Sequence, residues 1–161
     1  MSDPDRPVIV AFDGSPESHA AIRAAADLFR SRPLLIVSVW EPGLARVMQA
    51  QPDALGVTYP PPSAEEIATI DRIGEHHAES VAEAGARLAR ELGVSAEPVH
   101  VPDGRNIADT LISVAEQHDV AAMVVGSRGL GAVRSRLFGS TSRSLLDDAR
   151  RPVVVVRGHD D

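Results

Sequence analysis

The sequence predicts an α/β fold, with a parallel sheet covered by helices on both faces. Short runs of β-branched and apolar residues alternate with segments that carry a helical period, which is typical of strand–helix–strand units. The first two runs, residues 8–12 and 34–40, are almost entirely apolar, and this indicates strands that are buried in the sheet. No change of composition divides the 161 residues, so we expect a single domain over residues 1–161.

The first segments predict a strand–helix–strand unit. Val8–Phe12 is a β-branched run that predicts a buried strand, and Asp13 with the glycine after it ends that run. Ser15, followed by proline, is typical of a helix N-cap. Helical spacing then continues over residues 20–30, and residues 34–40 predict the second strand.

A long loop and a long helix follow. Residues 41–62 are rich in Pro and Gly and have no clear period, which predicts a surface loop. Residues 63–66 read Ser-Ala-Glu-Glu, a capping box that starts a helix, and Gly93 suits the position just beyond its end. We expect the apolar stripe of this helix to face the core: Ile70, Ile73, His77, Val81, Ala84, Leu88 and Leu92.

The C-terminal part of the chain repeats the alternation. Residues 96–101 predict a third strand, and residues 103–106, Asp-Gly-Arg-Asn, cap the helix that follows. The fourth strand is predicted over residues 120–125 and a further helix over residues 140–149. The valine run at residues 152–156 predicts the last strand.

Composition excludes several classes of function. The chain has no cysteine, and therefore no disulfide, thiolate nucleophile or zinc–thiolate site. Its net charge of −7 argues against nonspecific nucleic-acid binding, which needs a basic face. The N-terminus lacks the apolar core of a signal peptide, and the apolar runs are too short to cross a membrane. We therefore expect a cytoplasmic protein with neither a nucleic-acid nor a membrane partner.

Two glycine-containing segments near the C-terminal end predict a phosphate site. Residues 126–129, Gly-Ser-Arg-Gly, follow the fourth strand, and residues 139–142, Gly-Ser-Thr-Ser, open the next helix. Glycine permits positive φ and a close approach to an anion, and a helix N-terminus offers N–H groups and hydroxyls. The chain has no lysine, which rules out a Walker-type loop. Arg128, Arg134 and Arg136 are candidate phosphate clamps, and solvated loop arginines are the alternative.

The two site-like strand ends suggest one crevice. Ligands of open parallel sheets bind beyond the carboxyl ends of the strands, where the strand order reverses. If the first and fourth strands are neighbours, Asp13 faces the glycine segments, where a carboxylate suits a ribose hydroxyl or a cation. Backbone near Val39 could meet the edge of a base. Asp13 is also a candidate turn carboxylate, which is compatible with ligand contact, and Ser15 is expected mainly to cap its helix.

These residues resemble a known family. Asp13-Gly14-Ser15 after the first strand, together with G-x2-G-x9-G-[ST] after the fourth, resembles the nucleotide-binding branch of the universal stress protein family over nearly the whole chain. The resemblance implies an open five-stranded parallel sheet, order 3-2-1-4-5, with helices on both faces. It also implies binding of ATP, or of ADP or AMP, with or without Mg²⁺.

The resemblance assigns roles residue by residue. Asp13 matches the ribose-side carboxylate, and Ala11 and Val39 match the backbone positions on the adenine side. The phosphate motif falls on Gly126, Gly129, Gly139 and Ser140, with flanking hydroxyls on the next two residues. The predicted nucleotide contacts are Ala11, Phe12, Asp13, Ser15, Val39, Val125, Gly126, Arg128, Gly129, Gly139, Ser140, Thr141 and Ser142.

The resemblance also bears on assembly and activity. Members of the family commonly dimerise by pairing their last strands, and Val153–Val156 would form an exposed apolar edge in a monomer. We expect a stress-response regulatory protein rather than an enzyme, because no nucleophile–base–orienter set is apparent, and we expect no catalytic or metal-ligating residues. Two alternatives stay open: an interaction module whose pocket is empty or holds another ligand, and a weak ATPase.

Overall fold

A five-stranded parallel sheet forms the centre of the molecule. The computed structural model describes residues 5–43, 60, 62–127 and 139–158. The strands are β1 (Val8–Ala11), β2 (Leu34–Trp40), β3 (Ala96–Pro102), β4 (Ala122–Gly126) and β5 (Val153–Val156). They lie in the order β3-β2-β1-β4-β5, and every pairing is parallel. The predicted fold class and strand order are confirmed.

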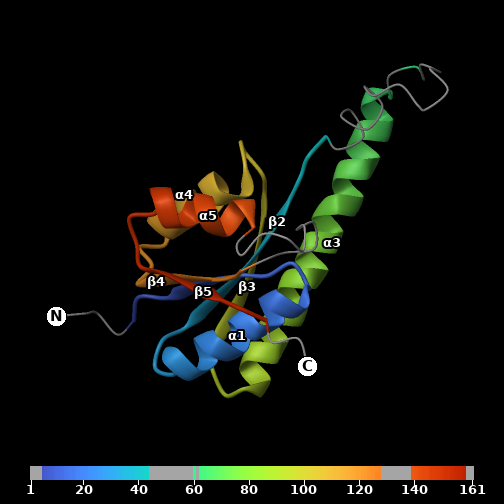
Figure 1. Ribbon diagram of the computed structural model, residues 1–161. Coiled ribbons are helices and arrows are strands. Elements are labelled where there is room, and N and C mark those ends of the chain that lie inside the picture. The colour runs from blue at the N-terminus through green and yellow to red at the C-terminus, as the bar shows by residue number, and fades with distance from the viewer. Residues whose placement is uncertain (1–4, 44–59, 61, 128–138, 159–161) are drawn as a thin grey trace.

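Helices cover both faces of this sheet (Figure 1). Helices α1 (Pro16–Leu28) and α3 (Ala64–Glu91) pack on one face, and α4 (Ile107–Gln117) and α5 (Ser140–Asp148) pack on the other. Alternate residues of each strand serve the two layers. In β1, for example, Val8 and Val10 face α1 and α3, whereas Ile9 faces α4, and all three have no exposed surface.

Three predicted helix starts are confirmed as side-chain caps. The Ser15 hydroxyl accepts a hydrogen bond from Ser18 N at the start of α1, at 3.2 Å. The Ser63 hydroxyl accepts one from Glu66 N, and the Glu66 carboxylate accepts from Ser63 N in return, which is a complete capping box. The Asn106 side chain caps α4. These hydrogen bonds span only three residues, so local sequence predicts them well.

The buried face of α3 is not the predicted stripe. Ile73 is 64% exposed, Leu92 45% and Ile70 38%, and His77 is also exposed. The face against the sheet consists of small residues instead: Ala78, Ala82, Gly85, Ala86 and Ala89. Small side chains let the helix backbone approach the strands closely, and a Cβ added at Gly85 would lie 2.7 Å from the Ile36 side chain. The larger residues of the stripe flank this face, and Val81 and Leu88 pack at the margin of the core.

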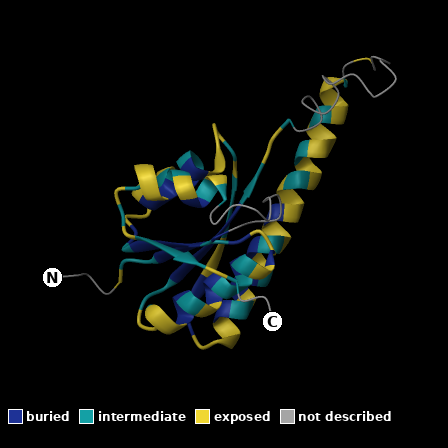
Figure 2. Ribbon diagram, in the orientation of Figure 1, coloured by how far each residue is buried: buried dark blue, intermediate teal, exposed yellow. Residues whose placement is uncertain are grey.

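The N-terminal half of α3 extends beyond the sheet (Figures 1 and 2). None of its residues before Ala78 is buried, so this half makes few core contacts. The Asp71 carboxylate accepts a hydrogen bond from Gly43 N at 2.6 Å, which ties this part of the helix to the end of β2. Among the helices described, none combines the length and the apolar character needed to span a membrane.

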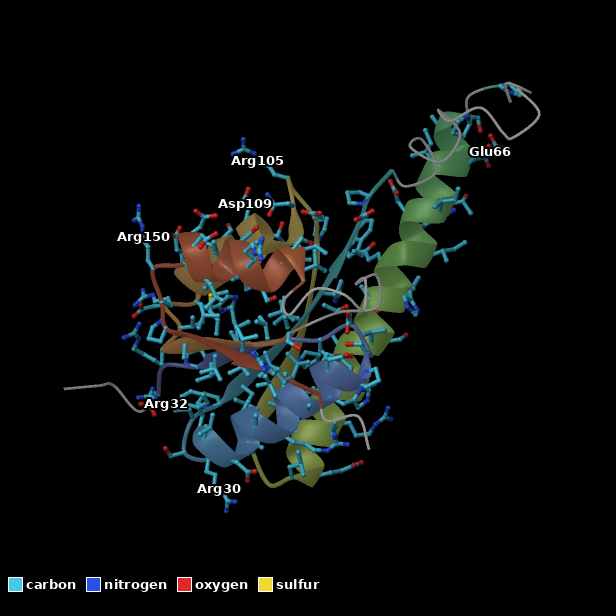
Figure 3. All side chains as sticks on the ribbon, viewed as in Figure 1. Arg30, Arg32, Glu66, Arg105, Asp109 and Arg150 are labelled. Carbon is cyan, nitrogen blue, oxygen red and sulfur yellow. The ribbon has the colours of Figure 1, made fainter. Side chains whose placement is uncertain are left out.

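A cluster of charges joins the amino ends of three strands. Asp119, just before β4, has a φ of +45°. Its carboxylate accepts from Arg6 Nη2 at 3.1 Å and from Arg151 Nη2 at 2.6 Å. Arg32, labelled in Figure 3, donates to the backbone oxygen of Arg6 at 3.0 Å. This Asp119 cluster (Arg6, Asp119, Arg151) lies at the starts of β1, β4 and β5. The predicted site lies at the other end of the strands, beyond their carboxyl ends.

Candidate functional site

The carboxyl ends of β1 and β4 lie side by side, as the crevice hypothesis requires. Val8 pairs with Ala122 and Val10 with Val124, so the turn after β1 and the segment after β4 leave the same edge of the sheet. The chain passes from β1 to β2 on one side, while β4 lies on the other. Strand order therefore reverses at this point, and it is here that open α/β sheets bind ligands.

Asp13 is positioned by the turn between β1 and α1. Its carboxylate Oδ1 accepts a hydrogen bond from Ser15 N at 2.9 Å, and Gly14 between them has a φ of +80°, which glycine adopts without strain. The Asp13 side chain is exposed, whereas Ser15 is buried beneath it as the helix cap. The turn thus fixes the direction of the carboxylate and leaves it accessible at the crevice.

The residues around Asp13 divide into interior and accessible positions. Phe12 is buried, and its ring stacks edge-to-face on His19 with centroids 4.9 Å apart. Val125 is buried in the layer beneath α4. These two residues can therefore offer a ligand only their backbone. Ala11 and Val39 are half-buried at the margin of the same layer, which leaves them accessible to a flat apolar group.

Gly126 is required for a reason that the sequence did not indicate. It ends β4 in register with Val156 and does not have positive φ, so the expected tight glycine turn does not explain it. A Cβ added there would lie 2.9 Å from the backbone carbon of Glu17 and 3.0 Å from its oxygen. The first turn of α1 passes directly over Gly126, and only a residue without a side chain fits beneath it.

Ser127 joins the two glycine segments. It is buried, and its backbone N–H donates to Val156 O at 2.7 Å. Its backbone oxygen accepts from Gly139 N at 2.6 Å and from the Ser142 hydroxyl at 3.3 Å. Sequence reasoning passed over Ser127 because these contacts involve its backbone. They hold the end of β4 against the start of α5.

The N-terminus of α5 lacks a side-chain cap. Gly139 is the N-cap residue with φ −68° and ψ 166°, an extended conformation open to any residue, and no side chain among the described residues caps the first turn. The first N–H groups of a helix have no partner within the helix, and the helix dipole favours an anion beside them. Ser140 is exposed and Thr141 half-buried at this end.

Ser142 differs from its two neighbours. Its side chain is buried, and the hydroxyl donates to Gly139 O at 3.1 Å as well as to Ser127 O. The donor is therefore used within the protein, and Ser142 acts on the site through the position of Gly139. Arg128, Gly129, Arg134 and Arg136 lie outside the described residues.

Within the described ranges, no group of three or more His, Asp or Glu side chains could hold a metal ion. The site residues that the structure does describe come from the β1–α1 turn, the ends of β2 and β4, and the start of α5. Together they place a carboxylate, half-buried apolar residues and a helix N-terminus without a described side-chain cap at the carboxyl ends of the strands. That combination suits a ligand with hydroxyls, an apolar ring and an anionic group.

Comparisons with known proteins agree with this architecture. A universal stress protein of Mycolicibacterium smegmatis is 31% identical in an alignment of 164 positions, which covers 95% of this chain and 48% of that protein. The chain spans about half the length of the first curated relatives it matches. The universal stress protein of Archaeoglobus fulgidus in complex with dAMP has a TM-score of 0.64 at 22% identity, with 96% of this chain and 99% of that chain covered.

A third protein has the same fold. A universal stress protein family protein from Arabidopsis thaliana with AMP bound has a TM-score of 0.63 at 16% identity, with 97% of this chain and 94% of that chain covered. At these identities the two solved structures show the fold alone. The model of the universal stress protein family matches residues 6–157 of this chain. The parallel sheet in the order β3-β2-β1-β4-β5 and this match over nearly the whole chain show that the protein belongs to the universal stress protein family.

Proposed function

We propose that this protein binds an adenine nucleotide in the crevice between the carboxyl ends of β1 and β4. The observation that carries the proposal is that Asp13 and the N-terminus of α5, which no described side chain caps, lie at the carboxyl ends of the strands. A nucleotide offers ribose hydroxyls to a carboxylate and phosphate oxygens to a helix N-terminus. The relatives solved with dAMP and AMP support an adenine base.

Each residue has a distinct role in this proposal. Asp13 accepts hydrogen bonds from the ribose, and the base lies against Ala11 and Val39. The phosphates lie at the backbone N–H groups of Ser140 and Thr141, with their hydroxyls beside them. Phe12 and Val125 offer only their backbone to the nucleotide. Ser15, Gly126, Gly139 and Ser142 hold the site in shape. The roles of Arg128 and Gly129 rest on the resemblance alone.

ATP is our proposed ligand, and ADP and AMP are the alternatives. Mg²⁺ would enter with the phosphates, since hard cations prefer carboxylate and phosphate oxygens. We infer that the protein binds the nucleotide as a regulatory signal in a stress response and does not turn it over. The absence of lysine supports this inference, because the phosphates lack one of the usual transition-state cations.

Calorimetry of the purified protein with ATP, with and without Mg²⁺, tests the proposal. Asp13→Asn retains a side-chain acceptor for Ser15 N but removes the charge, so the turn should survive. A hydrogen bond to a charged group is worth about 1.5–3 kcal/mol, so affinity should fall roughly 10–150-fold. Asp147→Asn, an exposed change of the same charge in α5, should bind like the parent. Absence of binding at millimolar nucleotide, or equal affinity for Asp13→Asn, would contradict the proposal.

The two alternative functions predict different results. A weak ATPase would release product in proportion to protein concentration, and Asp13→Asn would abolish that release. An interaction module without a nucleotide would show no calorimetric signal and no adenine nucleotide carried through purification in a native mass spectrum. A cytoplasmic location and the absence of a nucleic-acid partner stay predictions from composition.

We also propose that two copies of the chain pair through β5. This strand ends the described sheet, and its four valines are half-buried. Pro152 O and Val156 O accept from the β4 side, so by alternation Val153 and Val155 direct their N–H groups to the open edge. An apolar edge whose backbone donors have no partner among the described residues favours pairing with another strand.

Val155→Pro tests the proposed dimer. It removes an outward N–H without removing a hydrogen bond to β4, and proline is tolerated on edge strands. The variant should be monomeric by sedimentation equilibrium while Val155→Ile assembles like the parent. A parent protein that sediments as a monomer, or a Val155→Pro variant that still dimerises, would contradict pairing through β5.

A further inference from the structure

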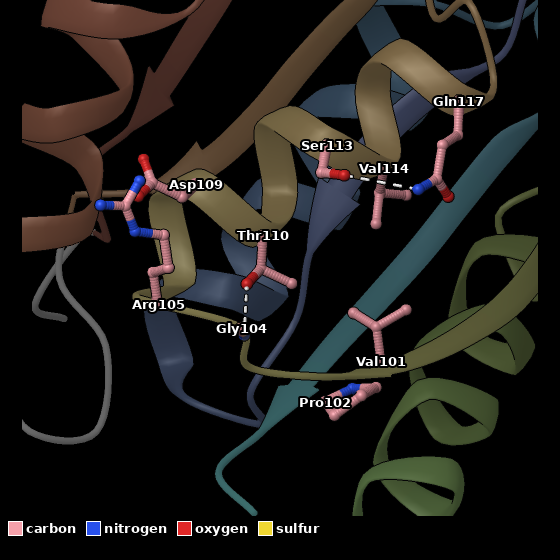
Figure 4. A pocket seen from close by; sticks show the side chains of 9 residues that line it. All are labelled: Val101, Pro102, Gly104, Arg105, Asp109, Thr110, Ser113, Val114 and Gln117. Carbon is pink, nitrogen blue, oxygen red and sulfur yellow. Dashed lines mark hydrogen bonds between the residues drawn. The ribbon is translucent and has the colours of Figure 1, made fainter.

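A groove between β3 and α4 adjoins the proposed nucleotide crevice, because Val101 in its lining pairs with Val39 of β2 (Figure 4). It has a volume of about 320 Å³. Its walls come from the end of β3, the loop that follows and the side of α4 turned toward β3. The residues that line it include none of the predicted nucleotide contacts: Val101, Pro102, Gly104, Arg105, Asp109, Thr110, Ser113, Val114 and Gln117.

The groove exists because α4 covers the edge of the sheet incompletely. The helix buries its apolar face against the sheet through Ala108, Leu111, Val114 and Ala115. Toward β3 it presents Thr110, Ser113 and Gln117, which are short or polar. Val101 is therefore only half-buried, and with Pro102 and the buried Val114 it gives the groove an apolar floor.

The polar groups of the walls mostly satisfy one another. The Thr110 hydroxyl donates to Asp103 Oδ1 at 3.0 Å and accepts from Gly104 N at 3.1 Å. Gln117 Nε2 donates to the Ser113 hydroxyl oxygen at 3.4 Å. These neutral polar groups therefore offer few free hydrogen-bonding atoms to a ligand. The two charged side chains of the lining, Arg105 and Asp109, determine which ligand the groove favours.

Arg105 and Asp109 are not equivalent. Asp109 Oδ2 accepts a hydrogen bond from Asn106 Nδ2 at 2.8 Å, and its backbone N–H is capped by the same side chain. Arg105 is exposed in the loop before α4 (Figure 3), and it forms no hydrogen bond or ion pair with any described residue. In Figure 4 the Arg105 guanidinium turns toward the Asp109 carboxylate, at the end of the groove away from Val101 and Val114, and no ion pair joins it to a described residue. The groove therefore has an apolar floor at one end and a guanidinium at the other, the donor group that best matches a carboxylate.

We propose that this groove binds a small monocarboxylate with an apolar body, the carboxylate on Arg105 and the body over Val101 and Val114. The volume is at the lower end of ligand pockets, which span about 300–1,000 Å³. The Asp109 carboxylate beside Arg105 would repel a second negative charge on the ligand. The groove should therefore favour a monocarboxylate over a nucleotide, which carries several negative charges. The proposal does not rest on nucleotide binding in the crevice.

Phenylacetate is a suitable probe, and phenylacetamide is its neutral counterpart. In methyl-resolved NMR titrations, phenylacetate should shift the methyl signals of Val101, Thr110 and Val114. Ligand efficiencies put a molecule of about ten non-hydrogen atoms in roughly the millimolar range of Kd. Phenylacetamide should bind about tenfold more weakly, because it lacks the charge-assisted hydrogen bond. Added salt should weaken binding of the acid and leave the amide unchanged.

Three variants separate the contributions. Arg105→Gln should make the acid and the amide bind equally. Arg30→Gln, at an exposed arginine just after the end of α1 on the other face of the sheet, should bind the acid like the parent. Ser113→Phe on the exposed wall should fill the groove and block both ligands. The proposal would be overturned if phenylacetate shifted none of the groove methyls at 20 mM, or if Arg105→Gln kept the preference for the acid.

Discussion

Replacement of Gly126 by alanine should destabilise the protein through the first turn of α1. The added Cβ would lie 2.9 Å from both the backbone carbon and the Cβ of Glu17, and 3.0 Å from its backbone oxygen. Carbon atoms pack favourably at about 3.5–4.0 Å, so helix and strand must separate by roughly half an ångström or more. The contact is with backbone, and a change of side-chain rotamer therefore cannot relieve it.

The expected cost is that of overpacking a tight interior, about 1–3 kcal/mol. For a chain of 161 residues, each kcal/mol shifts the melting temperature by about 2–4 °C, so Tm should fall by roughly 2–12 °C. Thermal unfolding followed by circular dichroism measures this change. Since Ser15 caps α1 and its N–H donates to the Asp13 carboxylate, displacement of the helix should also move Asp13 and weaken nucleotide binding in the same variant.

Gly104→Ala is the matched control for this substitution. A Cβ at Gly104 would meet no atom within 4 Å, and the residue does not have positive φ, so its Tm should stay within about 1–2 °C of the parent. If Gly126→Ala also melted at the parent temperature, the close approach of Glu17 would not be the reason for glycine at this position.

Three further substitutions test other parts of the fold. Gly85→Ala should lower the free energy of unfolding in urea by about 1–3 kcal/mol, because its Cβ would lie 2.7 Å from Ile36; stability equal to the parent would contradict the tight packing of α3. Hydrogen bonds from the Ser63 backbone and hydroxyl lower the pKa of Glu66. The Glu66 carboxylate therefore stabilises the fold at pH values above the ordinary pKa of glutamate. This stabilisation is lost as the pH falls through the lowered pKa. Glu66→Gln should therefore melt below the parent at about pH 6 and together with it at about pH 2, and a constant difference would argue against the linkage. Asp119→Ala should unfold more easily in urea than Asp119→Gly by about 1–2 kcal/mol, since both lose the carboxylate but only glycine adopts a φ of +45° without strain; equal stabilities would count against strain at this position.

Local signals in the sequence predicted the elements of the fold accurately. Apolar β-branched runs predicted the strands, and the caps at Ser15, Ser63 and Asn106 are present as hydrogen bonds. These features depend on residues within a few positions of one another. The strand order came from resemblance to a family and is confirmed by the pairing of β1 with both β2 and β4.

Features that depend on distant segments were predicted less well. The expected stripe on α3 was wrong because the helix backbone packs very close to the sheet. Only the alanines and Gly85 are small enough for that contact, so the larger residues lie beside it. Positive φ was expected at Gly126 and is absent; glycine is needed there because Glu17, more than a hundred residues earlier, occupies the space that a side chain would need. Ser127 was passed over because it acts through backbone.

The sequence by itself predicted the order of the strands and helices and their approximate bounds, with the fourth strand expected two residues too early at its start, and it suggested the residues of the candidate site. Hydrophobic periodicity and capping are short-range effects, so they can be read along the chain. Only the tertiary structure decided that Asp13, Gly126 and the start of α5 meet at one edge of the sheet. It also decided which face of α3 is buried and where α4 leaves a groove beside β3. The physical reason is that close packing depends on the shapes of segments far apart in sequence.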